Sequence, residues 1–415
     1  MLYIYRILIN IVVLISPIII LFRLLKKKED PKRFLEKYGI SPKGKINGKI
    51  VWLHGSSVGE ILSIMPLIEK LEKNKNIKNI LLTSSTVSSS KVIQNFNLKK
   101  TIHQFYPIDS NIIINRFLDN WKPNSAIFIE SEIWPNMILN LKKRNIPLIL
   151  LNARITKKTY KKWKGIYLFS KYLFEKFDIC LVQNDETNFY LKKLGAKKIK
   201  HIGNLKFSET NLKIKQKIQL SKKNFLYSKK ILFTAVSTHH GEEVFCGKLH
   251  TTLIKKHKNA ISIIIPRHTQ RCPEIIASLE EIGLKVHLHS SKKPINESVD
   301  VYIVDTYGET ETFLKMSKIV FLGGSLIKRG GQNPLEPARI GCKVIHGPHV
   351  ENFQEVYQLL NKIGISSKIK SINQGISIIN KYLKNGSNSK KNISKLNKIG
   401  NQILIKNYSC IRKYI

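Results

Sequence analysis

The sequence of 415 residues lacks the short motifs that identify several common enzyme classes. It has no GxxxxGK[ST] phosphate loop, which argues against an NTPase, and no GxGxxG opening a βαβ unit, which argues against a dinucleotide oxidoreductase. It has no HExxH pair, and the adjacent His239 and His240 point in different directions, so no metal site is expected. The five cysteines form an odd, scattered set without a CxxC pair, which implies neither a disulfide framework nor a zinc site and favours a reducing compartment.

Acidic residues are also scarce. There are 28 Asp and Glu against 71 Lys and Arg, which gives a formal net charge of +43. Part of this excess is compositional, because Lys, Ile and Asn are over-used throughout the chain, but the remainder indicates an anionic partner. The chain has no RNA- or DNA-binding motif, so we expect an anionic membrane surface and an anionic lipid substrate rather than nucleic acid.

The amino-terminal segment differs from everything that follows. Residues 2–25 are almost wholly apolar, and a span of about 20 residues crosses a bilayer. Lys26, Lys27 and Lys28 follow directly, so the positive-inside rule predicts a single-pass anchor with the bulk of the protein in the cytoplasm. A cleaved signal peptide fits less well, because no small-residue cleavage site follows. Arg6 and Pro17 leave open a helix that lies in the membrane interface.

Short β-branched runs alternate with helical patterns over most of the chain, which is typical of parallel α/β sheets. The strands expected in the first half are residues 49–53, 80–83, 101–105, 126–129, 148–151, 179–182 and 200–202. Those expected in the second half are residues 231–236, 260–265, 285–288, 301–304, 319–322 and 343–345. We therefore predict an α/β fold with two Rossmann-like domains facing across a cleft, although one larger sheet would give the same pattern.

Changes in composition predict the domain boundaries. After the membrane anchor, residues 1–25, the first domain covers residues 26–210. The Lys-rich polar segment 211–228 is the expected linker, and the second domain covers residues 229–385. Residues 386–415 are expected to be helical, with packing back on the first domain as one option.

A turn of small residues follows strand 49–53 and leads to Glu60. Glu60 falls at the start of the next helix, whose dipole favours the ionised carboxylate that a general base requires. Glu60 is therefore the candidate base, with a purely capping carboxylate as the alternative. The run from Gly55 to Gly59 also fits the GxSxG elbow of hydrolases, but the phosphate-type features of the second half would then have no role.

Further polar turns of the first half follow predicted strands. Glu130 and Glu132 stand at the end of strand 126–129, where two carboxylates are seldom explained by packing. Arg154 follows strand 148–151, and Lys206 follows strand 200–202. They are the cations that this half can direct at a phosphate or at developing negative charge.

The second half carries a glycine-rich turn behind the apolar run 319–322. Gly323-Gly324 and Gly330-Gly331 are followed by Asn333-Pro334-Leu335-Glu336-Pro337. Glycines at a strand end let backbone N–H groups approach a phosphate, and Glu336 can accept hydrogen bonds from the vicinal hydroxyls of a sugar. We interpret the segment as a nucleotide-sugar site, although alone it would also suit a tight turn.

Other strand ends of this half carry groups of the same kind. Pro266 and Arg267 follow strand 260–265, and a guanidinium there suits bidentate contact with phosphate. Strand 301–304 is followed by Asp305-Thr306-Tyr307-Gly308-Glu309. After strand 231–236, Ser237 or Thr238 can cap a helix whose N–H groups hold an anion.

Taken together, these motifs resemble those of the bacterial 3-deoxy-D-manno-octulosonic acid (Kdo) transferases of lipopolysaccharide synthesis. The resemblance covers nearly the whole chain. The matching blocks are Trp52-Leu53-His54 through Ser57-Val58-Gly59-Glu60, Glu130 through Trp134-Pro135-Asn136, Asn152-Ala153-Arg154, Gly203-Asn204-Leu205-Lys206-Phe207, Ser237-Thr238-His239 with Gly241-Glu242-Glu243, Pro266-Arg267-His268, Asp305-Thr306 with Gly308-Glu309, and Phe321 through Glu336-Pro337.

The resemblance implies a GT-B glycosyltransferase that moves Kdo from CMP-Kdo to the lipid A precursor (lipid IVA), inverts the anomeric centre and needs neither a metal nor a cofactor. It implies Glu60 as the proton acceptor, with Glu130 and Lys206 as transition-state stabilisers. The residues implied to hold CMP are Pro266, Arg267, Tyr307, Gly308, Glu309, Asn333, Pro334, Leu335 and Glu336. The alternatives are a GT-B enzyme with another nucleotide sugar and a non-catalytic basic protein that binds anionic lipid or nucleic acid.

The sequence departs from the family pattern at Val87, His240 and Gln332. The family often has Gly, Glu and His at these positions. Gln332 keeps a hydrogen-bonding group, whereas Val87 adds bulk on the side expected to bind the acceptor.

Overall fold

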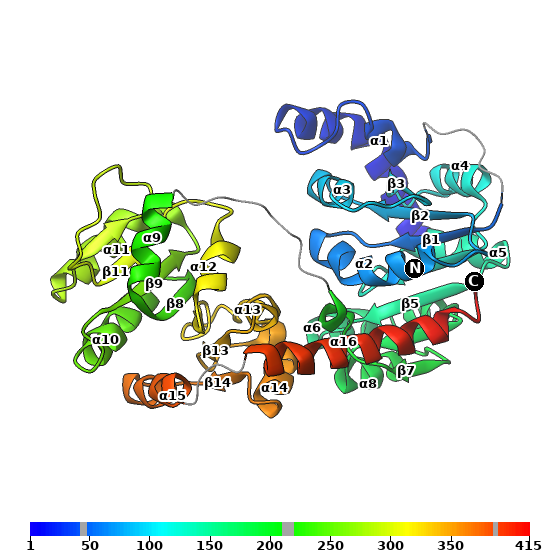
Figure 1. The fold of residues 1–415 in the computed structure, drawn as a ribbon. Helices are drawn as coiled ribbons and strands as arrows, with labels where there is room; N and C mark the ends of the chain where they lie inside the picture. The colour runs from blue at the N-terminus through cyan, green and yellow to red at the C-terminus, as the bar shows by residue number, and fades with distance from the viewer. Residues whose placement is uncertain (42–47, 210–219, 385–388) are drawn as a thin grey trace. The chain divides into compact units, whose positions relative to one another are not determined.

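The chain folds into two compact units, seen in the computed structural model, which describes residues 1–41, 48–209, 220–384 and 389–415 (Figure 1). Unit 1 comprises Met1–Thr210 together with Ile399–Ile415, and unit 2 comprises Asn211–Lys398. Each unit has its own sheet and its own hydrophobic core. This confirms the prediction of two separate α/β sheets and rules out the alternative of one larger sheet. The predicted cleft between the two domains stays a prediction.

Unit 1 is built on a parallel sheet of seven strands in the order β3-β2-β1-β4-β5-β6-β7. The strands are β1 (Ile50–His54), β2 (Asn79–Ser84), β3 (Thr101–Phe105), β4 (Ser125–Ile129), β5 (Leu148–Ala153), β6 (Ile179–Val182) and β7 (Ile199–His201). All seven were expected from the sequence to within two residues at either end. The strand order reverses between β1 and β4, and ligands of open α/β sheets bind outside the carboxyl ends of such a pair.

Helices and a large aromatic cluster cover the sheet of unit 1. The helical segments are η1 (Phe34–Tyr38), α2 (Val58–Glu72), α3 (Val87–Gln94), α4 (Asn111–Trp121), α5 (Pro135–Lys143), α6 (Lys157–Lys164), α7 (Tyr167–Phe174), α8 (Asp185–Lys193) and the short η2 (Leu205–Ser208). The ring of Trp52 is fully buried, with its centroid 5.0 Å from that of Phe117 and 5.2 Å from that of Phe128. This packing fixes β1 and β4 side by side, and therefore the turns that follow them.

Unit 2 also has a parallel sheet of seven strands, in the order β10-β11-β9-β8-β12-β13-β14. The strands are β8 (Lys230–Thr238), β9 (Ala260–Pro266), β10 (Val286–Leu288), β11 (Val301–Ile303), β12 (Ile319–Leu322), β13 (Lys343–His346) and β14 (Ser366–Lys368). The helical segments are α9 (Leu220–Ser228), α10 (Glu242–Ile254), η3 (Thr269–Arg271), α11 (Cys272–Glu281), α12 (Thr310–Met316), α13 (Leu335–Ile340), η4 (Glu351–Phe353), α14 (Gln354–Lys362) and α15 (Ile372–Lys384). The strand order reverses between β8 and β12, so the turns after these two strands meet.

The predicted linker, residues 211–228, is only partly a connection between the units. Residues 210–219 lie outside the described residues, but residues 220–228 form helix α9. Leu226 in this helix is fully buried, and α9 packs against β8. The helix was missed because its lysine-rich composition shows no apolar stripe, the usual sign of a helix that packs on a sheet.

The last helix, α16 (Ser389–Ile411), ends within unit 1. At Gly400 an added Cβ would lie 2.2 Å from the carbonyl oxygen of Phe207, so only glycine allows this approach. Ile403 packs against Gly203, and the side-chain amide of Asn74 donates to the Tyr408 hydroxyl at 3.4 Å. The boundary predicted between residues 385 and 386 lies outside the described residues.

The first helix, α1 (Leu2–Leu25), has the length and composition of a membrane segment. Its 24 residues include a window with a mean hydropathy of 2.6, of which 11% is buried in the protein. It is the one helix among the described residues that is long and apolar enough to cross a membrane.

Candidate functional site

Glu60 lies at the carboxyl end of β1, where the chain turns into α2. Ser57 is the N-cap of this helix, and its hydroxyl accepts a hydrogen bond from the Glu60 N–H at 3.3 Å. The Glu60 carboxylate reaches back: Oε2 accepts from the Ser56 N–H at 2.7 Å, and Oε1 accepts from the Ser57 hydroxyl at 3.0 Å. These reciprocal bonds are a variant of the capping box in which the carboxylate accepts from the N–H of the residue before the N-cap, so the capping role that was the alternative for Glu60 is present in the structure.

The pKa of Glu60 is raised from its ordinary value to about 7, chiefly by burial and then by the negative charges of Glu132 and Glu130. The hydrogen bonds from Ser56 and Ser57 act in the opposite direction but do not outweigh burial. The expectation that the helix dipole would favour the ionised form is therefore wrong in its net effect. A carboxyl group with a pKa near neutrality is nevertheless well suited to accept a proton, because it is a stronger base than an exposed glutamate.

Glu132 follows β4, and two ring nitrogens hold its carboxylate. Its Oε2 lies 3.0 Å from His54 Nε2 and accepts a hydrogen bond from Trp134 Nε1 at 2.7 Å. Burial alone would raise the pKa of Glu132, but the hydrogen bonds and the charge of His54 outweigh it and hold the pKa below its usual range. Glu132 is therefore a fixed negative charge beside Glu60.

His54, the last residue of β1, fixes Glu132 in turn. The ring is fully buried, stacks on Tyr106 at a centroid distance of 3.7 Å, and places Nδ1 3.0 Å from the Thr83 hydroxyl. Sequence reasoning assigned no role to His54 or Glu132. The available signal was a histidine ending an otherwise apolar buried strand, because a buried polar side chain requires a partner.

Glu130 and Lys206 form an ion pair at the same edge of the sheet, with 2.7 Å between Lys206 Nζ and Glu130 Oε1. Glu130 has a positive φ of 54°, an unusual conformation for a residue other than glycine. Asn152, near the end of β5 and also at positive φ, accepts a hydrogen bond from the Leu205 N–H at 3.0 Å and so ties the turn of Lys206 to the end of β5. The Arg154 N–H donates to the Glu130 carbonyl at 3.3 Å. The structure thus brings together the polar turns that the sequence indicated in the first half.

In unit 2 the turn after β12 packs directly on the turn after β8. An added Cβ at Gly323 would lie 2.3 Å from the Ser237 carbonyl oxygen, so glycine is required at this contact. The sequence suggested that the N–H groups of this turn hold a phosphate. The structure corrects this for Gly324, Ser325 and Leu326, whose N–H groups all donate to the carboxylate of Glu242 at 2.7 to 3.0 Å.

Glu242 is thus an internal anion that organises the glycine-rich turn. It is almost completely buried, and its carboxylate also accepts from the His239 N–H at 3.0 Å. The four backbone N–H groups satisfy a carboxylate that would otherwise be costly to bury. The sequence motif around Glu242 was recognised, but its charge serves the loop rather than a substrate.

The remaining residues expected to hold the donor lie at the carboxyl ends of neighbouring strands of unit 2. Arg267 follows β9 with its side chain exposed, while its N–H donates to the Thr238 carbonyl at 3.1 Å. After β11, Tyr307 is 71% exposed, and Gly308 has a positive φ of 91°. The next residue, Glu309, contacts the Thr306 hydroxyl and lies 3.2 Å from His289 Nε2.

The segment behind the glycine-rich turn starts α13. Asn333 accepts a hydrogen bond from the Leu335 N–H at 3.1 Å, and Pro334 is the N-cap. Leu335 is fully buried and anchors the short helix, whereas the Glu336 side chain is exposed. The predicted donor residues form three groups, which come after or at the ends of β9, β11 and β12. Because these strands belong to one parallel sheet, all three groups lie at the carboxyl edge of that sheet.

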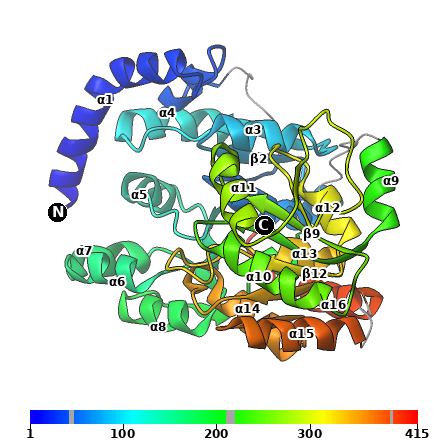
Figure 2. The ribbon, with the colours of Figure 1, turned by 90° about the vertical axis from the view of Figure 1, so that its left-hand side faces the viewer.

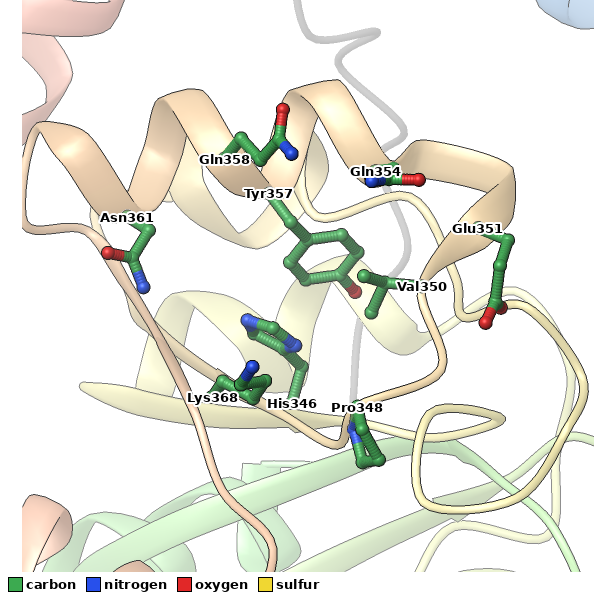
Figure 3. Close-up of a pocket in the computed structure, with 9 residues that line it drawn as sticks. All are labelled: His346, Pro348, Val350, Glu351, Gln354, Tyr357, Gln358, Asn361 and Lys368. Carbon is green, nitrogen blue, oxygen red and sulfur yellow. The ribbon is translucent and has the colours of Figure 1, made fainter.

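A pocket of about 420 Å³ opens further along this edge, at the ends of β13 and β14 (Figure 3). Its lining residues are His346, Pro348, Val350, Glu351, Gln354, Tyr357, Gln358, Asn361 and Lys368. The Tyr357 hydroxyl donates to the Gln332 carbonyl at 2.9 Å, which joins the pocket wall to the glycine-rich segment. Side-chain amides and one ammonium group can bind a hydroxyl-rich, anionic group. Sequence reasoning missed this pocket, because its lining residues are spread over β13, η4, α14, β14 and the loop after β13, without a motif.

Histidine, cysteine and carboxylate side chains do not gather in threes in a way that could hold a metal ion anywhere in the described ranges. All five cysteines are free, and four of them are buried. Burial raises the pKa of the Cys180 thiol, and the same holds for Cys272, whose pKa is about 11. These thiols are therefore neutral packing groups at physiological pH.

Comparison with known proteins identifies similar chains. The family model described as 3-deoxy-D-manno-octulosonic-acid transferase (kdotransferase) matches residues 32–209. The chain is 32% identical to the 3-deoxy-D-manno-octulosonic acid transferase of Rickettsia bellii over 90% of this chain and 88% of that protein. It is 27% identical to the Haemophilus influenzae protein of the same name over 98% of this chain and 96% of that protein.

Among solved structures, UDP-GlcNAc 2-epimerase from Neisseria meningitidis, bound to UDP-GlcNAc, matches with a TM-score of 0.55. The match covers 88% of this chain and 99% of that one at 13% identity. This likeness shows a shared fold of two α/β units.

Proposed function

Because the chain belongs to the 3-deoxy-D-manno-octulosonic acid transferase family, whose members are glycosyltransferases, we propose that it transfers Kdo from CMP-Kdo to the lipid A precursor, lipid IVA, in lipopolysaccharide synthesis. The observation that carries the proposal is the 32% identity to a family member over 90% of the chain. The position of Glu60 at the strand-order reversal of the first sheet supports it independently.

In the proposed reaction Glu60 is the general base. It removes the proton from a sugar hydroxyl of the acceptor as that oxygen forms a bond to the anomeric carbon of Kdo. The bond between this carbon and the CMP phosphate oxygen breaks, and CMP leaves with the electron pair. Attack opposite the leaving group inverts the anomeric centre, and the phosphate leaving group needs no metal or further cofactor in this scheme.

We propose that the Glu130–Lys206 pair stabilises the transition state. Positive charge develops on the sugar ring and negative charge on the departing phosphate, so a carboxylate and an ammonium group held 2.7 Å apart can each face a charge of opposite sign. Asn152 and the positive φ of Glu130 keep the pair in place before substrate arrives. This preorganisation reduces the rearrangement that the reaction requires.

The donor is assigned to the sheet edge of unit 2. Arg267 is the proposed phosphate contact, because its side chain is exposed while its backbone is fixed to β8. The proposed nucleoside contacts are Pro266, Tyr307, Gly308, Glu309, Asn333, Pro334, Leu335 and Glu336. For Leu335 the contact would be made by the backbone, since the side chain is fully buried.

The apolar helix α1 is compatible with a membrane anchor, which suits a lipid acceptor. We propose the cytoplasmic side of the inner membrane as the location of both units, with the net charge of +43 favouring its anionic surface.

A donor assay tests the function. The purified protein with lipid IVA is expected to consume CMP-Kdo and to leave UDP-sugars unchanged; turnover of a UDP-sugar alone would favour the alternative GT-B enzyme. A non-catalytic basic protein would show no turnover with any donor and lipid binding that collapses with salt.

A further inference from the structure

One face of α1 is sheltered along the whole length of the helix. The residues that are buried or partly buried are Leu2, Tyr5, Arg6, Ile9, Val13, Ser16, Ile20, Arg23 and Leu24. Their spacing of three or four residues places them on a single stripe of the helix. Unit 1 therefore covers α1 from its first turn to its last, as the helix running alongside the unit shows in Figure 2.

The first turns of α1 are tied to unit 1 by polar side chains. The Tyr5 hydroxyl donates to Asp109 Oδ2 at 2.6 Å, and Arg6 Nε donates to the Asn136 side-chain oxygen at 3.1 Å. Asp109 and Asn136 are themselves buried and bonded to each other, because the Asn136 N–H donates to Asp109 Oδ2 at 3.0 Å. This end of the helix therefore rests on a fixed polar network of unit 1.

The middle and the last turn are tied in the same way. The hydroxyls of Ser16 and Tyr38 are 2.8 Å apart, and Arg23 Nε donates to Glu29 Oε1 at 2.6 Å. Lys37 Nζ donates to the same Glu29 oxygen at 2.7 Å. Contacts at Tyr5 and Arg23 bind both ends of one helix to one unit, which fixes the helix along its surface.

The opposite face of α1 is apolar and open. Its exposed large apolar side chains are Tyr3, Ile4, Ile7, Leu8, Ile11, Val12, Leu14, Ile15, Ile18, Ile19, Leu21, Phe22 and Leu25. Unit 1 adds exposed apolar side chains beside the points of attachment: Ile112 at the start of α4, and Leu35 and Ile40 around η1. The exposed Lys26, Lys27 and Lys28 follow directly. An apolar surface bordered by lysines is complementary to an anionic bilayer.

Crossing the bilayer is incompatible with this attachment. The 24 residues of α1 extend about 36 Å, while the hydrocarbon core is about 30 Å thick. A spanning helix would carry its attached partners, Asp109, Asn136 and Tyr38 among them, through the hydrocarbon, where polar groups and backbone without regular pairing are strongly disfavoured. Detaching the helix would instead expose Arg6 and Arg23 to lipid.

We infer that α1 lies in the plane of the membrane interface, with its sheltered stripe on unit 1 and its apolar face in the bilayer, so that the amino-terminus stays on the same side as the catalytic units. This replaces the single-pass anchor expected from the sequence and agrees with the alternative that Arg6 and Pro17 left open. Unit 1 would thereby be held against the surface from which a lipid acceptor must be taken.

The sidedness of the amino-terminus tests the inference in the full-length, membrane-bound protein. A short hydrophilic extension with one cysteine is placed before Met1 in a Cys410→Ser background, because the other four cysteines are buried. A membrane-impermeant maleimide should label it in inverted inner-membrane vesicles and not in intact spheroplasts. Lys197→Cys, on the exposed surface of unit 1, is the matched control and should give the same pattern. Labelling of the extension in spheroplasts would overturn the inference.

The depth of the helix provides a second test that does not depend on the extension. Trp is introduced in place of Leu14, in the middle of α1, or of Phe22, near its end, both on the open face. In vesicles with brominated lipids, and after subtraction of the parent protein's signal, an interfacial helix gives similar shallow quenching at both positions. A spanning helix gives much deeper quenching at Leu14→Trp, and that result would refute the proposal. Neither test depends on Kdo transfer, so a failure here leaves the proposed function standing.

Discussion

The substitution Glu132→Gln tests proton transfer by Glu60 without changing Glu60 itself. The Glu132 carboxylate is the second cause, after burial, of the raised pKa of Glu60. Glutamine keeps an oxygen to accept from His54 and Trp134, so the local packing is retained while the charge is lost. Burial and the charge of Glu130, which is paired with Lys206, remain. The pKa of Glu60 should therefore fall without returning to its ordinary value.

The size of the effect follows from the loss of one charge. A pKa of about 7 predicts that activity in the parent enzyme falls as pH decreases through 7, because the protonated carboxyl cannot accept a proton. Removing a neighbouring carboxylate should lower this pKa by roughly 1 unit, which corresponds to about 1.4 kcal/mol. At pH 6 the ionised fraction of Glu60 then rises from about one-tenth to about one-half, so activity relative to its plateau should increase roughly five-fold.

The assay measures kcat/KM for the lipid acceptor as a function of pH, with CMP-Kdo at a saturating concentration. Its acidic limb is the decrease of kcat/KM as the pH falls through 7. Glu69→Gln, on the exposed side of the same helix α2, is the control and should leave the position of this limb unchanged. An acidic limb that is unchanged in Glu132→Gln, or that moves to higher pH, would refute the assignment of Glu60 as the titrating base.

Three other substitutions test individual parts of the account. Glu60→Gln should abolish turnover while CMP affinity, measured by calorimetry, stays nearly intact; a comparable rate would exclude the base. Arg267→Ala should weaken CMP binding by about ten-fold through loss of a charge-assisted contact, and unchanged affinity would exclude that contact. Glu242→Ala should lower the free energy of unfolding of unit 2 by about 3 kcal/mol or more in urea titration, because four backbone N–H groups lose their acceptor, whereas Glu280→Ala on the exposed side of α11 should have little effect. Equal stability of these two variants would contradict the role given to Glu242.

The elements that sequence reasoning predicted well are those with a strong local signal. Runs such as Ile50-Val51-Trp52-Leu53 are buried on both faces of a parallel sheet, so every position is apolar and the strand is unmistakable. Strand β14, Ser366-Ser367-Lys368, was missed because its pairing with β13 comes from its neighbour and not from its own composition. Helix α9 was also missed, because its position depends on the burial of Leu226 and its lysine-rich composition does not indicate a packed helix.

Sequence reasoning singled out Glu60 and Glu130 because polar residues directly after buried strands are conspicuous. The structure places both at the carboxyl ends of neighbouring strands, β1 and β4, and their catalytic roles stay predictions. The internal contacts of the candidate site were not predicted. That Glu242 fills the glycine-rich turn could not be read from the sequence, because a carboxylate that binds backbone N–H groups looks the same as one that faces a substrate. The sheltered stripe of α1 was equally hidden, since its partners at Asp109 and Asn136 lie more than 100 positions further along the chain.

The mass of the lipid product tests the central claim most directly. After incubation of the protein with CMP-Kdo and lipid IVA, mass spectrometry should show the acceptor increased by the mass of one or more Kdo units, with CMP released in equal number. An unchanged acceptor under conditions in which the protein is folded and binds CMP would contradict the account.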